Sequence, residues 1–369
     1  MADRILLLTV LMLLGLGSVV VFSSSTAVSE EYFGASTKLI LSHLVKVVLG
    51  LGLLFVMARI DYRMIRGLCL PLVVASTVLL ALTLVPNSPW AVTTKGATRW
   101  LDLGFMVVQP AELAKLALVV HIASILASGE GRVREYRRGF VPVLTVLGVF
   151  VVCLVQQPNF GNALTLTLVA AVMLFLGGAR IRHLFGSGLA TMPMLVFVAI
   201  QRPHVIRRFE GFLDPGSDPL GAGFQLRQSL VALGSGGFFG VGPGAGRQSG
   251  FFLPDSHTDF VFAVVGEEFG LLGTLLVVAL FGLLLWRGTV IACRATDPFG
   301  RYLAIGVTAM IGVVAFLNMA VAVGLAPTAG LPLPFVSYGG SAMMVNLGGV
   351  GILLSIASRA GLGRRRVLA

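Results

Sequence analysis

The sequence predicts an all-α polytopic membrane protein with about ten transmembrane helices. Of its 369 residues, 56% are hydrophobic and only 12% are charged, and the mean hydropathy is +0.94. A soluble domain carries about a quarter charged residues, so water does not suit most of this surface. Apolar segments recur along the whole chain, and a span needs roughly 20 apolar residues to cross the hydrocarbon core of a bilayer.

Each predicted span is an apolar segment bounded by polar residues or glycines. The spans begin near Arg4, Lys38, Gly67, Pro110, Gly139, Gly161, Phe185, Val261, Arg301 and Ser341. Alternate connections hold most of the 27 basic residues, all on one side of the predicted membrane. Because cytoplasmic loops accumulate Lys and Arg, both termini are predicted to lie in the cytoplasm.

The charge and the cysteines restrict the function classes. The net charge of +11 is explained by the basic cytoplasmic loops, so we expect membrane lipids and no nucleic acid as partners. The three cysteines, Cys69, Cys153 and Cys293, lie in separate segments without paired spacing. They indicate neither a disulfide framework nor a metal site.

The chain is predicted to form a single membrane domain over residues 1–369. Most connections between spans are short, but two predicted outer segments are long, Pro86–Gln109 and Pro203–Phe260. Loops of this length in a compact protein are usually functional or disordered, and the many Phe and Leu residues argue against disorder. We therefore expect a large ordered extracytoplasmic loop, residues 203–260, between the seventh and eighth spans.

The fourth predicted span places two opposite charges in an apolar helix. Glu112 and Lys115, in the segment QPAELAKL (Gln109–Leu116), are three residues apart, so on a helix they share a face and can pair. Ionisable groups inside spans are rare and usually mark functional sites. We favour a functional role over an ion pair that only fixes the packing of this helix.

Acidic residues also gather where the large outer loop enters the eighth span. The segment LPDSHTDF (Leu253–Phe260) runs into VFAVVGEEFG (Val261–Gly270). One helix mouth is therefore expected to hold Asp255, His257, Asp259, Glu267 and Glu268. Carboxylates placed there could act as general bases or bind a divalent cation, whereas Thr258 or Asp259 could instead cap the helix. For His257 we favour a supporting hydrogen bond over a catalytic role.

Against the trend of basic residues inside, the large outer loop carries four arginines, Arg207, Arg208, Arg227 and Arg247. A guanidinium group matches phosphate oxygens bidentately, so these residues predict an anionic ligand. The first two have acidic neighbours, Glu210 and Asp214, and we therefore prefer Arg227 and Arg247 as phosphate ligands. The glycine run Gly234–Gly246 lacks the Lys-Ser/Thr ending of a nucleotide loop, which excludes that kind of site.

Five segments, in this order along essentially the whole chain, carry a resemblance to a known family. They are KGATRWLDLG (Lys95–Gly104), QPAELAKL (Gln109–Leu116), Phe212–Gly242, LPDSHTDFVFAVVGEE (Leu253–Glu268) and LPLPFVSYGGSAMMVN (Leu331–Asn346). They resemble the SEDS family (shape, elongation, division and sporulation), which includes FtsW, RodA and SpoVE. FSSS (Phe22–Ser25) and GAGRQS (Gly244–Ser249) resemble FtsW more than RodA. Asn159 and Asn162 depart from the family, where Asp and Thr are usual.

The resemblance implies a peptidoglycan glycosyltransferase that polymerises lipid II at the outer face of the bacterial cytoplasmic membrane, for cell division or cell shape. An acceptor 4-hydroxyl would attack C1 of the donor sugar and expel undecaprenyl pyrophosphate. The essential aspartate of the family corresponds to Asp259, and its fourth-helix acid and lysine correspond to Glu112 and Lys115. A class B penicillin-binding protein is the implied transpeptidase partner.

The resemblance and the charges together give a predicted site. We assign catalysis to Asp259, Glu112 and Lys115, and substrate binding to Arg99, Trp100, His257, Arg227 and Arg247. Asp259 either accepts the hydroxyl proton or holds a divalent cation, Mg²⁺ or Mn²⁺, that neutralises the leaving group. The alternatives are a lipid II flippase, which would place charges along the whole crossing, and a scaffold for a transpeptidase, which would leave the three catalytic candidates unexplained.

Overall fold

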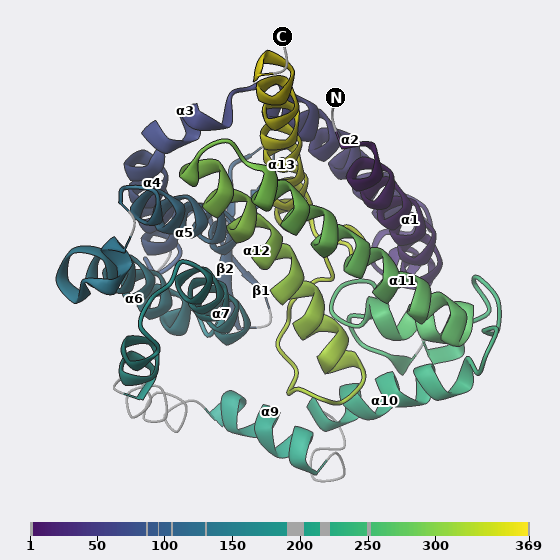
Figure 1. Ribbon diagram of the computed structural model, residues 1–369. Helices are drawn as coiled ribbons and strands as arrows, with labels where there is room; N and C mark the ends of the chain where they lie inside the picture. Colours follow the sequence, from purple (N-terminus) through teal and green to yellow (C-terminus); the bar gives the residue numbers. More distant parts are fainter. Residues whose placement is uncertain are drawn as a thin grey trace.

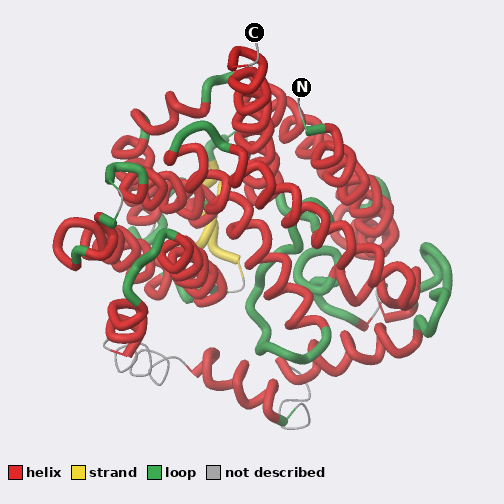
Figure 2. The backbone as a smooth tube through the Cα atoms, in the orientation of Figure 1, coloured by secondary structure: helices red, strands yellow, loops and turns green. Residues whose placement is uncertain are grey.

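The computed structural model describes residues 3–85, 88–94, 96–104, 106–129, 131–189, 203–214, 222–248 and 252–367. Long helices account for most of it (Figure 1), with loops gathered around their ends (Figure 2). The main helices are α1 (Arg4–Phe33), α2 (Lys38–Arg59), α4 (Cys69–Leu82), α5 (Pro110–Leu126), α6 (Val141–Gln156), α7 (Phe160–Leu176), α11 (Val261–Arg294), α12 (Pro298–Ala322) and α13 (Gly340–Val367). Short connecting turns are α3 (Tyr62–Gly67), a 3₁₀ turn at Arg132–Arg134 and a π turn at Tyr136–Phe140.

The helices are membrane-spanning by length and composition. Within the described ranges, 6 helices are long and apolar enough to cross a bilayer, and α4 and α7 are apolar but shorter. The prediction of an all-α polytopic membrane protein is therefore confirmed. The seventh predicted span, starting near Phe185, continues into residues outside the described ranges, so the total of ten spans stays a prediction.

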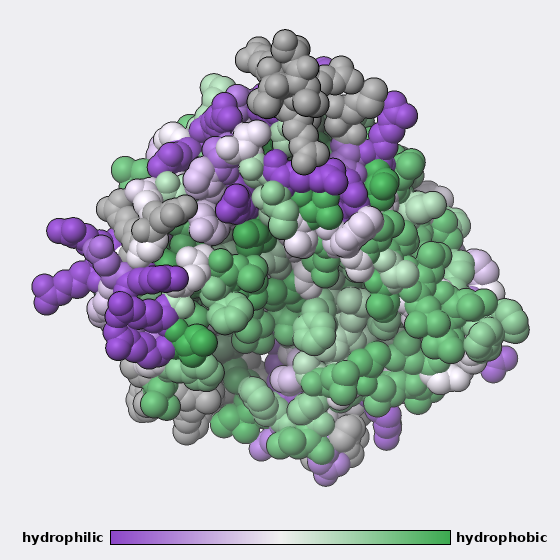
Figure 3. All heavy atoms as spheres, viewed as in Figure 1, coloured by the Kyte–Doolittle hydropathy of each residue, from purple (hydrophilic) through white to green (hydrophobic). Residues whose placement is uncertain are grey.

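The interior of the bundle is formed mainly by α5 and α12. Both helices are buried on most of their faces, and α5 packs against α4, α7 and α12. The helix α2 runs along α13, while α11 packs on α12 and α1. Outward-facing leucines and valines of α2 and α11 are exposed, as a lipid environment requires. Figure 3 shows this hydrophobic surface across the middle of the molecule, with hydrophilic side chains gathered near the two termini and at the left edge of the view.

The first long outer segment folds as a small antiparallel sheet, which the all-α prediction did not include. Strand β1 (Ala91–Thr94) pairs with β2 (Ala97–Asp102), and β2 pairs with β3 (Val107–Val108). The β-branched Val and Thr residues favour strands, and Gly96 with φ of 72° makes the turn between β1 and β2. The strands β2 and β3 contact α5 and α13, so this sheet covers the outer end of the bundle.

The second long outer segment contains two helices, α9 (Pro203–Leu213) and α10 (Ala222–Ser235). They lie at the end of the molecule opposite to the two chain termini (Figure 1). The helix α10 packs against α11 and α12 and contacts α9. The described parts of the loop are therefore folded against the bundle, whereas residues 215–221 and 249–251 lie outside the described ranges.

Glycines allow the chain after α10 to pack directly on α11. Gly240 has φ of 83°, and Gly270, inside α11, has φ of 65° and kinks the helix. A Cβ atom on Gly270 would lie 2.4 Å from the backbone nitrogen of Gly240, closer than any side chain allows. The backbone N–H of Gly242 donates to the carbonyl of Glu268 at 3.0 Å. The outer half of α11 is therefore clamped by this turn.

Candidate active site

Asp259 lies in a tight turn immediately before α11. Asp255 adopts a left-handed conformation with φ of 55°, and its carbonyl accepts hydrogen bonds from the backbone N–H groups of Thr258 and Asp259, both at 3.0 Å. The N-cap of α11 is Phe260, and no side chain caps this helix. The alternative that Thr258 or Asp259 caps the helix is therefore not what the structure shows.

The backbone of Asp259 is held by the centre of the bundle. The Asn318 side chain, on α12, donates one hydrogen bond to the carbonyl of Asp259 at 2.8 Å and another to the carbonyl of Leu331 at 2.7 Å. Gly330 lies against the carboxylate, because a Cβ atom there would be 3.7 Å from Asp259 Oδ2. Asp259 is only partly buried, so its backbone is anchored while the residue remains partly accessible.

Two arginines from distant segments share the electrostatic environment of Asp259. Arg99 belongs to β2 and Arg208 to α9. Burial lowers the pKa of the Arg99 guanidinium, Arg208 lowers it further, and the Asp259 carboxylate opposes this shift. Burial also lowers the pKa of Arg208, again opposed by Asp259. Two cations and one carboxylate are thus gathered where β2, α9 and the start of α11 meet.

Each of these arginines is fixed by backbone carbonyls. Arg208 Nη1 donates to the carbonyl of Thr328 at 3.2 Å. Arg99 Nε donates to the carbonyl of Gln157 at 3.3 Å, and its Nη2 donates to that of Pro158. These acceptors are neutral, so Asp259 is the one carboxylate that the electrostatics of the described residues set against both guanidinium groups. A phosphate group could therefore bind between them.

Buried amides lie at the entrance of α7, beside the same cluster. Asn162 Nδ2 donates to Asn159 Oδ1 at 3.0 Å, while Asn159 Nδ2 and Asn162 Oδ1 have no further partner among the described residues. Gly161 contacts the backbone of Ala329, next to Gly330, since a Cβ atom on Gly161 would lie 2.1 Å from the Ala329 carbonyl oxygen. The two departures from the family pattern therefore lie close to Asp259, as neutral groups able to bind hydroxyls.

Glu112 and Lys115 form the ion pair that their spacing predicts. Lys115 Nζ lies 2.7 Å from Glu112 Oε1, with side-chain exposures of 4% and 2%. The start of α5 is tied to α13, since the Gln109 N–H donates to Ser341 Oγ at 2.9 Å. The pair is enclosed in the interior of the bundle, whereas Asp259 is partly exposed, so the structure gives these residues different surroundings.

The other predicted substrate ligands occupy different surroundings. Trp100 and His257 are half-buried, the former on β2 beside Arg99. Arg227, on α10, and Arg247, after the glycine run, are exposed. The structure places Arg208 next to Asp259, although its acidic neighbours had favoured the other two arginines. The proximity of Arg208 to Asp259 depends on long-range packing, which the local sequence does not predict.

Glu267 and Glu268 make hydrogen bonds to the segment after the glycine run and to α1. The Gln248 N–H donates to Glu267 Oε1 at 2.8 Å, and Ser23 Oγ of α1 donates to Glu268 Oε1. Both glutamates are buried. Their side chains join α1 and the glycine-rich turn to α11, and the expected convergence of these two acids with Asp259 on one helix mouth stays a prediction.

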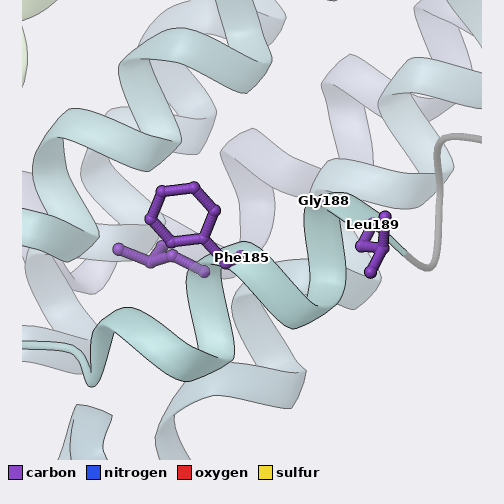
Figure 4. A pocket seen from close by; sticks show the side chains of 4 residues that line it. Phe185, Gly188 and Leu189 are labelled. Atoms are coloured by element: carbon purple, nitrogen blue, oxygen red, sulfur yellow. The ribbon is translucent and has the colours of Figure 1, made fainter.

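A divalent cation finds few ligands around Asp259. Mg²⁺ and Mn²⁺ take several oxygen ligands, but the described residues contain no group of three or more His, Cys, Asp or Glu side chains suited to a metal ion. A metal ion at Asp259 therefore stays a prediction, and we derive no step through one. A separate hollow, beside Leu184, Phe185, Gly188 and Leu189, is apolar (Figure 4) and offers no catalytic group.

The comparisons with known sequences cover nearly the whole chain. The family FTSW_RODA_SPOVE, described as "Cell cycle protein", matches residues 4–361. The "Probable peptidoglycan glycosyltransferase FtsW" of Geobacter sulfurreducens is 41% identical over 357 residues, which is 97% of this chain and 95% of that protein. The "Stage V sporulation protein E" of Bacillus subtilis is 36% identical, over 96% of each chain.

Solved structures agree with this similarity. A chain from "Structural coordination of polymerization and crosslinking by a peptidoglycan synthase complex" has a TM-score of 0.79 and 31% identity, covering 97% of this chain and 98% of that one. The Rod shape determining protein RodA of Thermus thermophilus has a TM-score of 0.70 and 30% identity, covering 97% of each chain.

Proposed function

The chain belongs to the FtsW, RodA and SpoVE family and is a cell-wall glycosyltransferase, and we propose that it polymerises lipid II at the outer face of the bacterial cytoplasmic membrane. The observation that supports this proposal is the cluster of Asp259, Arg99 and Arg208. Three segments that are distant in sequence bring a carboxylate and two cations to one place. Lipid II would present a hydroxyl to the first and a pyrophosphate to the others.

In the proposed reaction, the 4-hydroxyl of the acceptor sugar attacks C1 of the donor sugar. A new C–O bond forms, the bond between C1 and the pyrophosphate oxygen breaks, and the leaving group keeps that electron pair. Asp259 accepts the hydroxyl proton as a general base. Attack from the face opposite the leaving group inverts the configuration at C1.

Arg99 and Arg208 would stabilise the leaving pyrophosphate. Negative charge grows on that group as the C1–O bond breaks, and prepositioned cations stabilise such charge more strongly away from water. Both guanidinium groups are held by backbone carbonyls, so they need little reorganisation when the substrate binds. In this proposal, two protein side chains supply the positive charge that the leaving pyrophosphate needs.

Glu112 and Lys115 would hold the start of α5 in place and shape the floor of the site. The β2 strand that carries Arg99 rests on α5, so a shift of α5 would move Arg99. The buried pair is therefore proposed to act on the geometry of the reacting groups. Trp100, next to Arg99, is proposed to contact the sugar.

The proposed partner is a class B penicillin-binding protein, which would crosslink the new strands. A chain similar to this one is part of a structure described as a "peptidoglycan synthase complex". Exposed leucines along α11, including Leu271, Leu272 and Leu275, offer an apolar surface for a spanning helix. A polymerase and a transpeptidase held together would pass the glycan strand directly between their sites.

The first prediction tests the proposed function by replacing Asp259. The purified Asp259→Asn protein should lose at least about 10²-fold in lipid II polymerisation, because a general base typically contributes 10²–10⁴-fold. The measurement is the yield of glycan strands on a gel, with thermal unfolding measured in parallel. The matched control is Asp102→Asn, an exposed aspartate of the same outer region, which should retain activity. Near wild-type polymerisation by Asp259→Asn would contradict the assignment.

A further inference from the structure

Lys46 is a charged residue inside a span that the proposed reaction does not use. It lies in α2 (Lys38–Arg59), among largely apolar residues. Cations at this depth are costly and mark functional sites. Lys46 Nζ donates a hydrogen bond to the Tyr338 hydroxyl at 2.7 Å and lies 4.1 Å from the centre of that ring. The ammonium group is therefore directed at one aromatic side chain in the segment before α13.

Tyr338 packs against the first half of α2. Its ring stacks on that of His43, with centroids 6.0 Å apart, and its hydroxyl lies 3.3 Å from Ser42 Oγ. Since Lys46 donates to the phenol oxygen, the phenol O–H remains available to donate to Ser42. The stem of Lys46 crosses the first turn of α13, because a Cβ atom on Gly340 would lie 3.1 Å from Lys46 Cδ. Lys46 therefore contacts both the Tyr338 hydroxyl and the first turn of α13.

Tyr338 and its neighbour also hold the segment that carries Asp259. The Tyr338 N–H donates to the carbonyl of His257 at 2.9 Å, and the His257 ring lies edge-on to the Tyr338 ring at 5.9 Å. Ser337 Oγ donates to the carbonyl of Thr258. The two residues before Asp259 are therefore bonded to the two residues Ser337 and Tyr338. Any movement of Tyr338 would be transmitted to Asp259.

We propose that Lys46 is a positioning residue, which fixes Tyr338 and through it the backbone that presents Asp259 to the acceptor hydroxyl. The inference rests on the proposed function of Asp259. A hydrogen bond from an ammonium group is roughly twice as strong as a neutral one, and more so away from water. Lys46 thus holds Tyr338 more tightly than a neutral side chain would. Misplacing a reacting group by about 1 Å can cost about 10²-fold in rate.

The test is a double-mutant cycle on lipid II polymerisation by the full-length protein. Lys46→Met and Tyr338→Phe should each lower kcat about 10-fold while KM for lipid II stays within about twofold. The kcat of the double variant should be no lower than that of the less active single variant, because both substitutions break the same contact. Lys46→Arg should restore much of the rate, since a guanidinium group can also donate to the phenol oxygen. The matched control is Lys38→Met, an exposed lysine of the same helix.

Each contrary result would overturn the inference in a distinct way. Unchanged kcat in Lys46→Met, or equal losses in Lys38→Met, would show that Lys46 does not position the site. A raised KM with normal kcat would show that Lys46 binds substrate directly. Multiplied losses in the double variant would separate Lys46 from Tyr338. Wild-type protein that does not polymerise lipid II would instead contradict the proposed function, so the two failures are distinguishable.

Discussion

Two ion pairs with the same i,i+3 spacing differ in burial, one in α5 and one beside the π turn at Tyr136–Phe140. The side chains of Lys115 and Glu112 are only 4% and 2% exposed, whereas those of Arg138 and Glu135 are 79% and 59% exposed. An exposed ion pair contributes about 0–1 kcal/mol, while a buried charge costs several kcal/mol unless it is paired. The buried pair therefore needs a functional reason that the exposed pair does not.

The predicted orientation in the membrane can be tested directly. Single cysteines at Arg247 and Arg137, in a protein whose own Cys69, Cys153 and Cys293 have been replaced, should behave in opposite ways. A membrane-impermeant thiol reagent applied to whole cells should label Arg247→Cys and spare Arg137→Cys, because only the first lies in the predicted outer loop. Both positions are exposed, so accessibility within the protein does not bias the result. The reverse labelling pattern would contradict the predicted orientation in the membrane.

The buried ion pair should be sensitive to the loss of either partner. Glu112→Gln and Lys115→Met should each lower the free energy of unfolding by about 3–5 kcal/mol, because the remaining charge is left buried and unpaired. Polymerisation should fall with it as the support for β2 loosens. The measurements are thermal unfolding in detergent and lipid II turnover at a temperature where each variant is folded.

A charge-swapped double variant, with Glu112→Lys and Lys115→Glu, separates a structural from a catalytic role. It restores a pair of opposite charges on the same helix face. If stability and turnover both recover, the pair acts only through packing. If stability recovers and turnover does not, at least one of the two groups acts on the substrate from its own position.

The next smaller effect concerns the phosphate ligands at the outer end. Arg208→Gln should raise KM for lipid II about 10-fold, since Arg208 is the outer arginine that the structure places beside Asp259. The control is Arg207→Gln, the exposed neighbour on the same helix, which should change KM by less than about twofold. A larger effect from Arg227→Gln or Arg247→Gln would instead favour the assignment based on sequence and place the phosphates further out.

The spans and the pair on α5 were predictable because they depend on local features. Apolar length identifies a span, and three-residue spacing places Glu112 and Lys115 on one helix face. The small sheet was missed, although the β-branched residues Val92, Thr93, Thr94 and Thr98 flank Gly96, and β-branched runs separated by a glycine turn are typical of a hairpin. The all-α prediction treated this segment, Pro86–Gln109, only as a long connection between two spans.

The role of Arg208 and that of Lys46 could not be predicted from local features. Arg208 has acidic neighbours in sequence, yet the fold directs it to Thr328 and Asp259. Lys46 carried one signal, a lysine inside an apolar segment, but its partner Tyr338 lies 292 residues further along the chain. Long-range packing of α2, α9 and the segment before α13 decides both contacts, and a single sequence does not contain that information.

The smallest expected effect on stability and turnover belongs to the exposed ion pair of Arg138 and Glu135. Arg138→Gln removes a contact of 3.9 Å to Glu135 in which both side chains are largely solvated. Water already screens these charges, and holding two long side chains together costs entropy, so the free energy of unfolding should change by less than about 1 kcal/mol. Lipid II turnover should stay within about twofold of wild type. Thermal unfolding measured beside Lys115→Met gives the comparison directly, because both substitutions remove one cation from an i,i+3 pair. Equal losses in the two variants would show that burial does not distinguish the two pairs, and the special role of Glu112 and Lys115 would be contradicted.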